Sequence, residues 1–131
     1  MKLGYTLLYV PDVLKSVEFY ERAFGLARRF ASENGQYAEM ETGATTLGFV
    51  RLDLARSNLP GGFRENRLGE PPAGIEIGFV TPDVEDAYQK AVEAGAKAEA
   101  PPKTKPWGQV VAYVRDLDGV LVEIASPMGG A

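Results

Sequence analysis

The sequence predicts an α+β fold, in which two βαβββ modules form a cupped mixed sheet with helices on the outer face. The triplet Pro-Asp-Val occurs twice, at residues 11–13 and 82–84. Each triplet follows a run of aromatic and branched residues, which is typical of a strand, and precedes apolar residues at helical spacing. Each helical pattern ends at a glycine, Gly25 or Gly95. Two copies are too few for a stacked repeat array, so this repeat indicates an internal duplication.

The length of 131 residues suits a single domain. We expect this domain to consist of two repeats, at about 1–52 and 74–126, joined by a loop over 53–73. The loop prediction depends on a polar stretch that is interrupted by Pro and Gly and has no sustained period. A connection of roughly twenty residues is long for a compact domain, which favours a covering loop or a functional flap.

In the first repeat, residues 5–10 are predicted to form a strand. Asp12 is expected to cap the following helix, because its carboxylate can accept a hydrogen bond from a free amide of the first turn. A hairpin is predicted over 28–41, around an Asn-Gly turn signal. Residues 45–51 are predicted to form the last strand of this repeat.

In the second repeat, residues 76–81 are predicted to form a strand, and Asp83 is expected to cap the helix that follows. The proline-rich segment 101–106 is predicted to be a loop that leads to the single tryptophan of the chain. Strands are predicted over 109–115 and 120–125, joined by a tight turn.

Composition excludes several classes of function. The net charge is −4 and there is no basic stripe, which disfavours nucleic acid as a partner and suits a cationic or neutral small ligand. The chain has neither cysteine nor histidine, so it cannot form a Ser-His-Asp triad, a two-histidine iron site, or a zinc site with Cys or His ligands. No run has transmembrane length, and no signal-peptide core is evident. We therefore expect a cytoplasmic protein that does not bind membranes.

Two pairs of segments resemble the vicinal oxygen chelate superfamily, which includes glyoxalase I, extradiol dioxygenases, and fosfomycin- and bleomycin-resistance proteins. Residues 8–13 and 19–26 are similar to the opening of these proteins, and residues 106–109 and 113–124 are similar to their closing signature. The resemblance covers nearly the whole chain. It is specific for the fold and poorly specific for the reaction.

In the metal-using members of this superfamily, a ligand lies on the first strand and another on the last strand of each module. The resemblance places these positions at Tyr5, Gly48, Glu76 and Glu123. Two carboxylates, a phenol and a glycine are a poor site for zinc, nickel or iron, and magnesium or manganese usually needs more oxygen ligands. We therefore expect no metal cofactor; if a divalent cation binds, its ligands are Glu76 and Glu123.

Strand alternation directs one set of side chains away from the helices and into the expected pocket. Two facing carboxylates there would raise at least one pKa, suiting acid–base chemistry or a cationic ligand, and Arg115 could instead neutralise them. Trp107 either stacks on a ligand or anchors its loop. Tyr37 and Tyr113 either line the pocket or belong to the core. The residues expected to bind a ligand are Tyr5, Leu7, Tyr37, Gly48, Glu76, Trp107, Arg115 and Glu123.

Three functions fit this pattern. The first is a metal-free small-molecule-binding protein of the glyoxalase/bleomycin-resistance type, which sequesters an aromatic or cationic compound. The second is a divalent-metal-dependent lyase or isomerase that uses Glu76 and Glu123. The third is a domain that presents an acidic surface to another protein. Because each half exposes an apolar sheet face, we also expect a homodimer.

Overall fold

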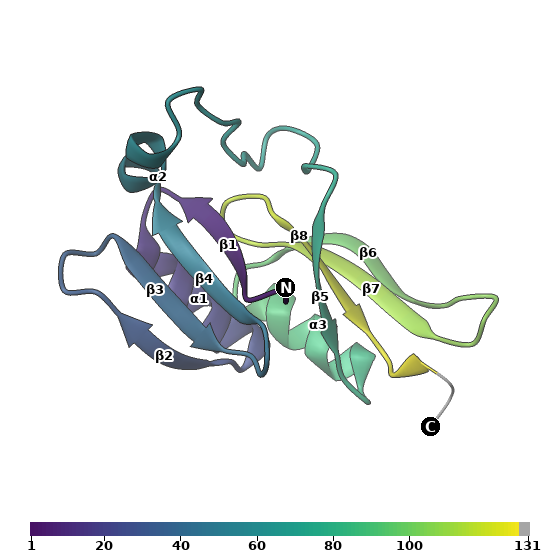
Figure 1. The fold of residues 1–131 in the computed structure, drawn as a ribbon. Coiled ribbons are helices and arrows are strands. Elements are labelled where there is room, and N and C mark those ends of the chain that lie inside the picture. Colours follow the sequence, from purple (N-terminus) through teal and green to yellow (C-terminus); the bar gives the residue numbers. More distant parts are fainter. Residues whose placement is uncertain (129–131) are drawn as a thin grey trace. The chain divides into compact units, whose positions relative to one another are not determined.

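The structure, a computed structural model, describes residues 1–128 and contains two compact units (Figure 1). The boundary between the units follows Glu65, inside the predicted connecting segment, so each unit holds one repeat. The first unit comprises β1 (Tyr5–Val10), α1 (Val13–Phe24), β2 (Ala27–Ala31), β3 (Tyr37–Glu41), β4 (Thr46–Arg51) and α2 (Leu52–Asn58). The second unit comprises β5 (Glu76–Val80), α3 (Val84–Glu93), β6 (Lys97–Thr104), β7 (Val110–Arg115) and β8 (Leu121–Ala125).

The two units have the same topology. Their strand orders are β1-β4-β3-β2 and β5-β8-β7-β6, and in each sheet the first strand is parallel to the last while the other pairs are antiparallel. In the first unit α1 packs against β2, β3 and β4, and in the second α3 packs against β6, β7 and β8. These two mixed sheets with their helices confirm the predicted α+β class of two βαβββ modules.

Both main helices begin at the predicted caps. Asp12 Oδ1 accepts a hydrogen bond from the Lys15 amide at 3.1 Å, and Asp83 Oδ1 accepts one from the Asp86 amide at 3.0 Å. The first helix ends at Gly25, whose φ of 68° favours a residue without a side chain.

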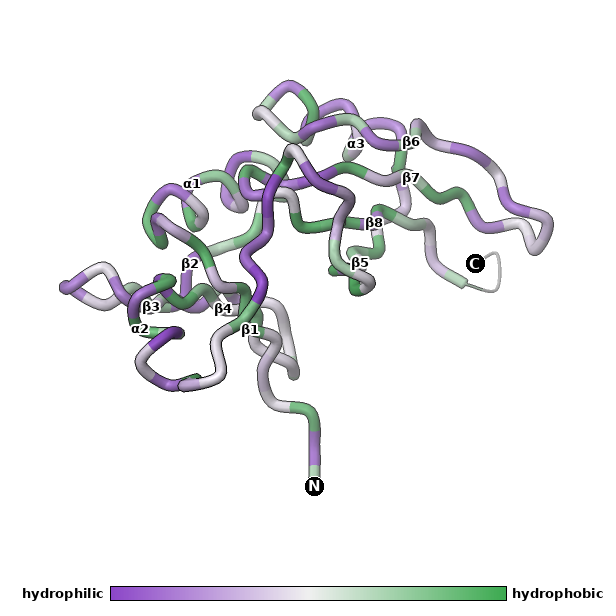
Figure 2. The backbone as a smooth tube through the Cα atoms, turned by 90° about the horizontal axis from the view of Figure 1, so that it is seen from above, coloured by the Kyte–Doolittle hydropathy of each residue, from purple (hydrophilic) through white to green (hydrophobic). Residues whose placement is uncertain are grey.

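Each sheet has one face covered by its helix and one face that we call the open face. In β1, Leu8 and Val10 are buried on the helix side, whereas Tyr5 is 60% and Leu7 39% exposed on the open face. In the second unit the apolar residues of β7 and β8 are the main contribution of the sheet to the core (Figure 2). This alternation was predicted, and it determines which side chains are available to a ligand.

The loop prediction for 53–73 is wrong at its start, because α2 (Leu52–Asn58) occupies that segment. This helix has only seven residues, too few to show a helical period, and it buries Ala55. The loop prediction for 101–106 is also wrong over most of its length, since β6 runs through both of its first prolines as far as Thr104. An edge strand tolerates proline, and the β6–β7 register shifts between Ala100 and Lys103.

No helix among residues 1–128 combines the length and the apolar character that crossing a bilayer requires.

Candidate functional site

An acidic pair lies on the open face of the second unit. Glu123 of β8 stands between Gly78 of β5 and Tyr113 of β7 in one cross-strand row. A Cβ on Gly78 would be 3.6 Å from Glu123 Oε2, so the carboxylate lies over this glycine. The Glu76 carboxyl and the Tyr113 hydroxyl both lie close enough to Glu123 for its charge to act on them. The structure thus brings together the two carboxylates that the sequence predicted, with a phenol beside them.

The surroundings of Glu76 favour its protonated form. Desolvation raises the pKa of Glu76 above its ordinary value, and the neighbouring charge of Glu123 raises it further. Desolvation also raises the pKa of Tyr113, and the charges of Glu123 and Glu76 add to this effect. A carboxyl whose pKa is raised by burial beside a second carboxylate is suited to exchanging a proton, and the two groups together are suited to accepting a cation.

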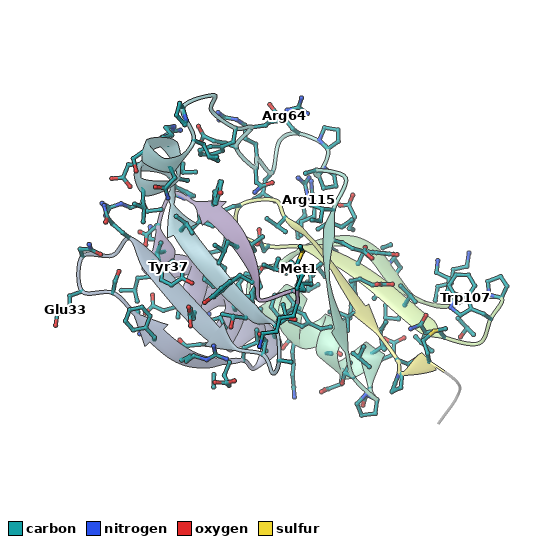
Figure 3. The ribbon with its side chains drawn as sticks, in the orientation of Figure 1. Met1, Glu33, Tyr37, Arg64, Trp107 and Arg115 are labelled. Carbon is teal, nitrogen blue, oxygen red and sulfur yellow. The ribbon has the colours of Figure 1, made fainter. Side chains whose placement is uncertain are left out.

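Arg115 does not neutralise this pair. It lies in the same cross-strand row as Glu76, through Leu121, and paired residues share a face. Arg115, however, is only 3% exposed, and its guanidinium donates to the backbone carbonyl of Gly119 and to two carbonyls of the connecting segment (Figure 3). Within residues 1–128, neither Glu76 nor Glu123 makes an ion pair.

The open face of the first unit is arranged differently. Leu7, Gly48 and Glu39 form its central row. A Cβ on Gly48 would lie 2.8 Å from Leu7 Cδ2 and 3.4 Å from the Tyr37 hydroxyl, so these two side chains fill the space above the glycine. Gly48 is therefore a packing position that a larger residue could occupy only by displacing its neighbours.

A polar network surrounds this glycine. The Tyr37 hydroxyl donates to Glu39 at 2.7 Å, and Arg29 donates to Glu39, Glu41 and Thr46. Burial, with the hydrogen bond and charge of Glu39, raises the pKa of Tyr37. Unlike the acidic pair of the second unit, the carboxylates of this network are already matched by a cation.

Glu39 and Arg29 were not predicted as site residues. The signal for Glu39 was available: it lies between the buried Ala38 and Met40, the same pattern that singled out Glu123. Arg29 had no such signal, because its role depends on the pairing of β2 with β3 and of β3 with β4.

Trp107 lies apart from the acidic pair of its own unit. It occupies the tip of the β6–β7 hairpin, at the end of β7 opposite to Arg115 (Figure 3). Its indole is 63% exposed and donates from Nε1 to Gln109 Oε1 at 2.9 Å, and Gln109 in turn donates to the Ser126 carbonyl. The indole is thus both exposed and fixed in orientation.

The residues at the four superfamily metal positions do not fit a transition metal. Tyr5 and Glu76 begin β1 and β5, and Gly48 and Glu123 lie on β4 and β8. These positions supply a phenol, two carboxylates and no fourth side chain, and the space above Gly48 is filled. Across residues 1–128, no group of three or more His, Cys, Asp or Glu side chains is placed to hold a metal ion.

Comparison with known proteins agrees with the fold. The family model described as the Glyoxalase/Bleomycin resistance protein/Dioxygenase superfamily matches residues 2–124. The uncharacterized protein YraH of Bacillus subtilis (strain 168) is 32% identical over 125 residues, which are 95% of this chain and 97% of that protein.

Solved structures show the same fold at lower identity. A glyoxalase-related enzyme from Fulvimarina pelagi is 22% identical with a TM-score of 0.83, covering 97% of this chain and 88% of that one. The hypothetical protein SA1046 from S. aureus is 20% identical with a TM-score of 0.79, covering 97% and 94%. With its repeated βαβββ topology and this match along almost its whole length, the chain belongs to the glyoxalase/bleomycin resistance protein/dioxygenase superfamily.

Proposed function

We propose that this protein binds a small aromatic cation without the help of a metal ion, and that the open face of the second unit supplies the anionic part of the binding site. The observation that carries the proposal is the acidic pair. Glu76 and Glu123 lie side by side on an open sheet face, and no cation among residues 1–128 is paired with either. A positively charged ligand would relieve the repulsion between them and form charge-assisted hydrogen bonds.

The aromatic character of the ligand is supported by the neighbours of the pair. Tyr113 presents a half-buried phenol beside Glu123, and Gly78 leaves the opposite side of the carboxylate uncovered by a side chain. A flat ligand can approach the sheet closely over a glycine and place its ring near the tyrosine. Binding and release without chemical change would make the protein a sequestering agent.

The charge requirement can be tested with three ligands of nearly equal size: benzamidine, which is cationic, benzamide, which is neutral, and benzoate, which is anionic. We expect benzamidine to raise the melting temperature of the protein and the other two to have no effect. Saturation at about a hundredfold excess over Kd corresponds to about 2.7 kcal/mol. Equal responses to benzamidine and benzamide would contradict the role of the carboxylates.

The residue requirement can be tested by calorimetric titration of Glu76→Gln and Glu123→Gln. Each substitution should weaken benzamidine binding about tenfold or more, which is about 1.4 kcal/mol. Glu99→Gln is the matched control, because Glu99 is an exposed carboxylate on β6 of the same unit. Equal losses in all three variants would show a general charge effect and no site.

A metal-dependent lyase or isomerase that uses Glu76 and Glu123 is the second candidate. It is favoured by the acidic pair itself, since two carboxylates can hold magnesium or manganese when several waters complete the coordination. It is disfavoured by Tyr5 and Gly48, which provide no strong ligand. Titration with Mg²⁺, Mn²⁺, Zn²⁺ and Ni²⁺ distinguishes the two, because we expect no saturable binding of any of them.

A further inference from the structure

Arg115 of β7 is a buried cation whose hydrogen bonds go to backbone carbonyls. Nε donates to the Gly119 carbonyl at 3.0 Å, Nη1 to that of Leu68 at 3.1 Å, and Nη2 to that of Arg67 at 3.0 Å. Arg115 makes no ion pair with a carboxylate of residues 1–128. Burying a charge is costly unless it is well hydrogen-bonded. The planar fork of an arginine, which reaches three carbonyls at once, satisfies this requirement.

The carbonyls of Arg67 and Leu68 reach Arg115 because the turn after β7 leaves room for them. A Cβ on Gly119 would stand 2.8 Å from the carbonyl carbon of Arg67 and 2.8 Å from Arg115 Nη2, and the φ of Gly119 is 98°. The turn is held by the buried Asp116, whose Oδ1 accepts hydrogen bonds from two backbone amides of the turn. The turn and the connecting segment therefore form one packed anchor.

The segment that leaves this anchor leads directly into β5. We call residues 67–75 the strap. The Arg67 carbonyl also accepts from the Glu70 amide at 3.2 Å, two prolines follow at 71 and 72, and the Ile75 amide donates to the Ala73 carbonyl at 2.8 Å. Prolines and local hydrogen bonds restrict the conformations of the strap, so its anchored end limits where β5 can begin.

Within its own unit, the strand β5 has few other constraints. It is at the edge of its sheet and, among residues 66–128, pairs only with β8, while α3 packs mainly on β6, β7 and β8. Its residues are exposed or half-buried along its whole length. A slip of one residue in its pairing would turn Glu76 away from Glu123 to the opposite face.

We propose that Arg115 is a positioning residue: by anchoring the strap it sets the register of β5 against β8, and so places Glu76 beside Glu123. The same contacts keep the guanidinium away from the carboxylates with which it shares the open face, so the pair keeps its charge for a cation. This consequence for binding rests on the proposed function, whereas the positioning of β5 can be observed without a ligand.

Hydrogen–deuterium exchange tests the positioning on the full chain. In Arg115→Lys the single ammonium cannot reach three carbonyls. We expect the amides of Glu70 and of β5 to exchange about tenfold faster or more, while the buried strands β7 and β8 keep their protection. Arg28→Lys is the control, because Arg28 is an arginine of the first unit whose side chain hydrogen-bonds to Glu21, and it should leave β5 unchanged. Faster exchange across the whole second unit, or no change in β5, would overturn the proposal.

A second variant covers the case in which Arg115→Lys does not fold. Insertion of two glycines between Gly69 and Glu70 leaves the Arg115 contacts intact but uncouples them from β5. We expect the same fast exchange in β5; normal exchange would overturn the proposal.

The consequence for ligand binding is tested with benzamidine on the same variants. Both the lysine variant and the insertion should weaken its binding about tenfold, and neither should weaken it further when Glu76→Gln is present. If benzamidine binds neither the unmodified chain nor the variants, the proposed function fails. In that case the exchange data still decide whether Arg115 positions β5.

Discussion

The Glu123 carboxylate lies over Gly78, 3.6 Å from the place that a Cβ on this glycine would occupy. In the first unit the order is reversed, since the large residue, Leu7, stands on the first strand and covers the glycine, Gly48, on the last. Both sheets therefore pair a large residue with a glycine in this row. The large residue lies on the first strand in the first unit and on the last strand in the second. One row is closed by an apolar side chain, and the other presents a carboxylate.

This difference predicts that alanine destabilises the protein at Gly48 and is tolerated at Gly78. In Gly48→Ala the new Cβ would meet Leu7 at 2.8 Å and the Ala38 carbonyl at 3.0 Å, which is too close without movement of the backbone. We expect a loss of about 1–3 kcal/mol in the free energy of unfolding by urea. Gly78→Ala is the matched control and should be nearly neutral, because its Cβ has 3.6 Å of space. Equal effects would mean that the packing above Gly48 is loose.

The acidic pair predicts a pH-dependent stability. The pKa of Glu76 in the folded chain is raised above its ordinary value of 4.5, so the folded state holds a proton that the unfolded chain releases. The stabilisation that Glu76 contributes is fully present below pH 4.5 and is lost as the pH rises through the raised pKa of Glu76 in the folded chain. Glu76→Gln should remove this part of the pH dependence, measured by urea unfolding at several pH values, whereas Glu99→Gln should not. A profile unchanged by Glu76→Gln would contradict the raised pKa of Glu76.

The hydrogen bond from the Tyr37 hydroxyl is expected to stabilise the folded protein. Tyr37→Phe removes the 2.7 Å hydrogen bond to Glu39 and leaves a part-buried carboxylate with one donor fewer. We expect a loss of about 1 kcal/mol in unfolding free energy. Because the pKa of this tyrosine is raised, spectrophotometric titration of the folded protein should also show one late-ionising phenol fewer in the variant. An unchanged number of late-ionising phenols would contradict the raised pKa of Tyr37.

The exposed apolar side chains support the proposal of a homodimer. Tyr5 and Leu7 remain 60% and 39% exposed on the open face of the first unit. Light scattering should give about twice the chain mass of 14.2 kDa, and Tyr5→Glu should lower this mass at equal concentration. Leu14→Glu is the control, since Leu14 is 49% exposed on α1. A monomer at high concentration would refute the dimer.

Alternation and capping carried most of the fold prediction. The positions of Leu8 and Val10, of Asp12 and of Asp83 follow from local rules, and each lies where those rules place it. The same alternation correctly put Glu76 and Glu123 on one face. Glu123 lies between the buried residues Val122 and Ile124, and a carboxylate in that position must point away from the core.

What the sequence could not predict depends on contacts between distant residues. The β6 strand contains Pro101 and Pro102, which favour a loop unless the strand is known to lie at the edge of the sheet. Arg115 was expected near the carboxylates, but the carbonyls that bind it lie 47 and 48 residues earlier in the chain. No local pattern encodes such a contact.

The prolines of β6 have a consequence for the behaviour of the protein in concentrated solution. A free sheet edge can recruit strands from other molecules through its unpaired amides, which is a route to aggregation. Pro101 and Pro102 have no amide hydrogen, and the register shift beside them interrupts the strand at the same point. The outer edge of the second sheet is thereby a poor template for a growing fibre, and replacing the two prolines with valine would remove this protection.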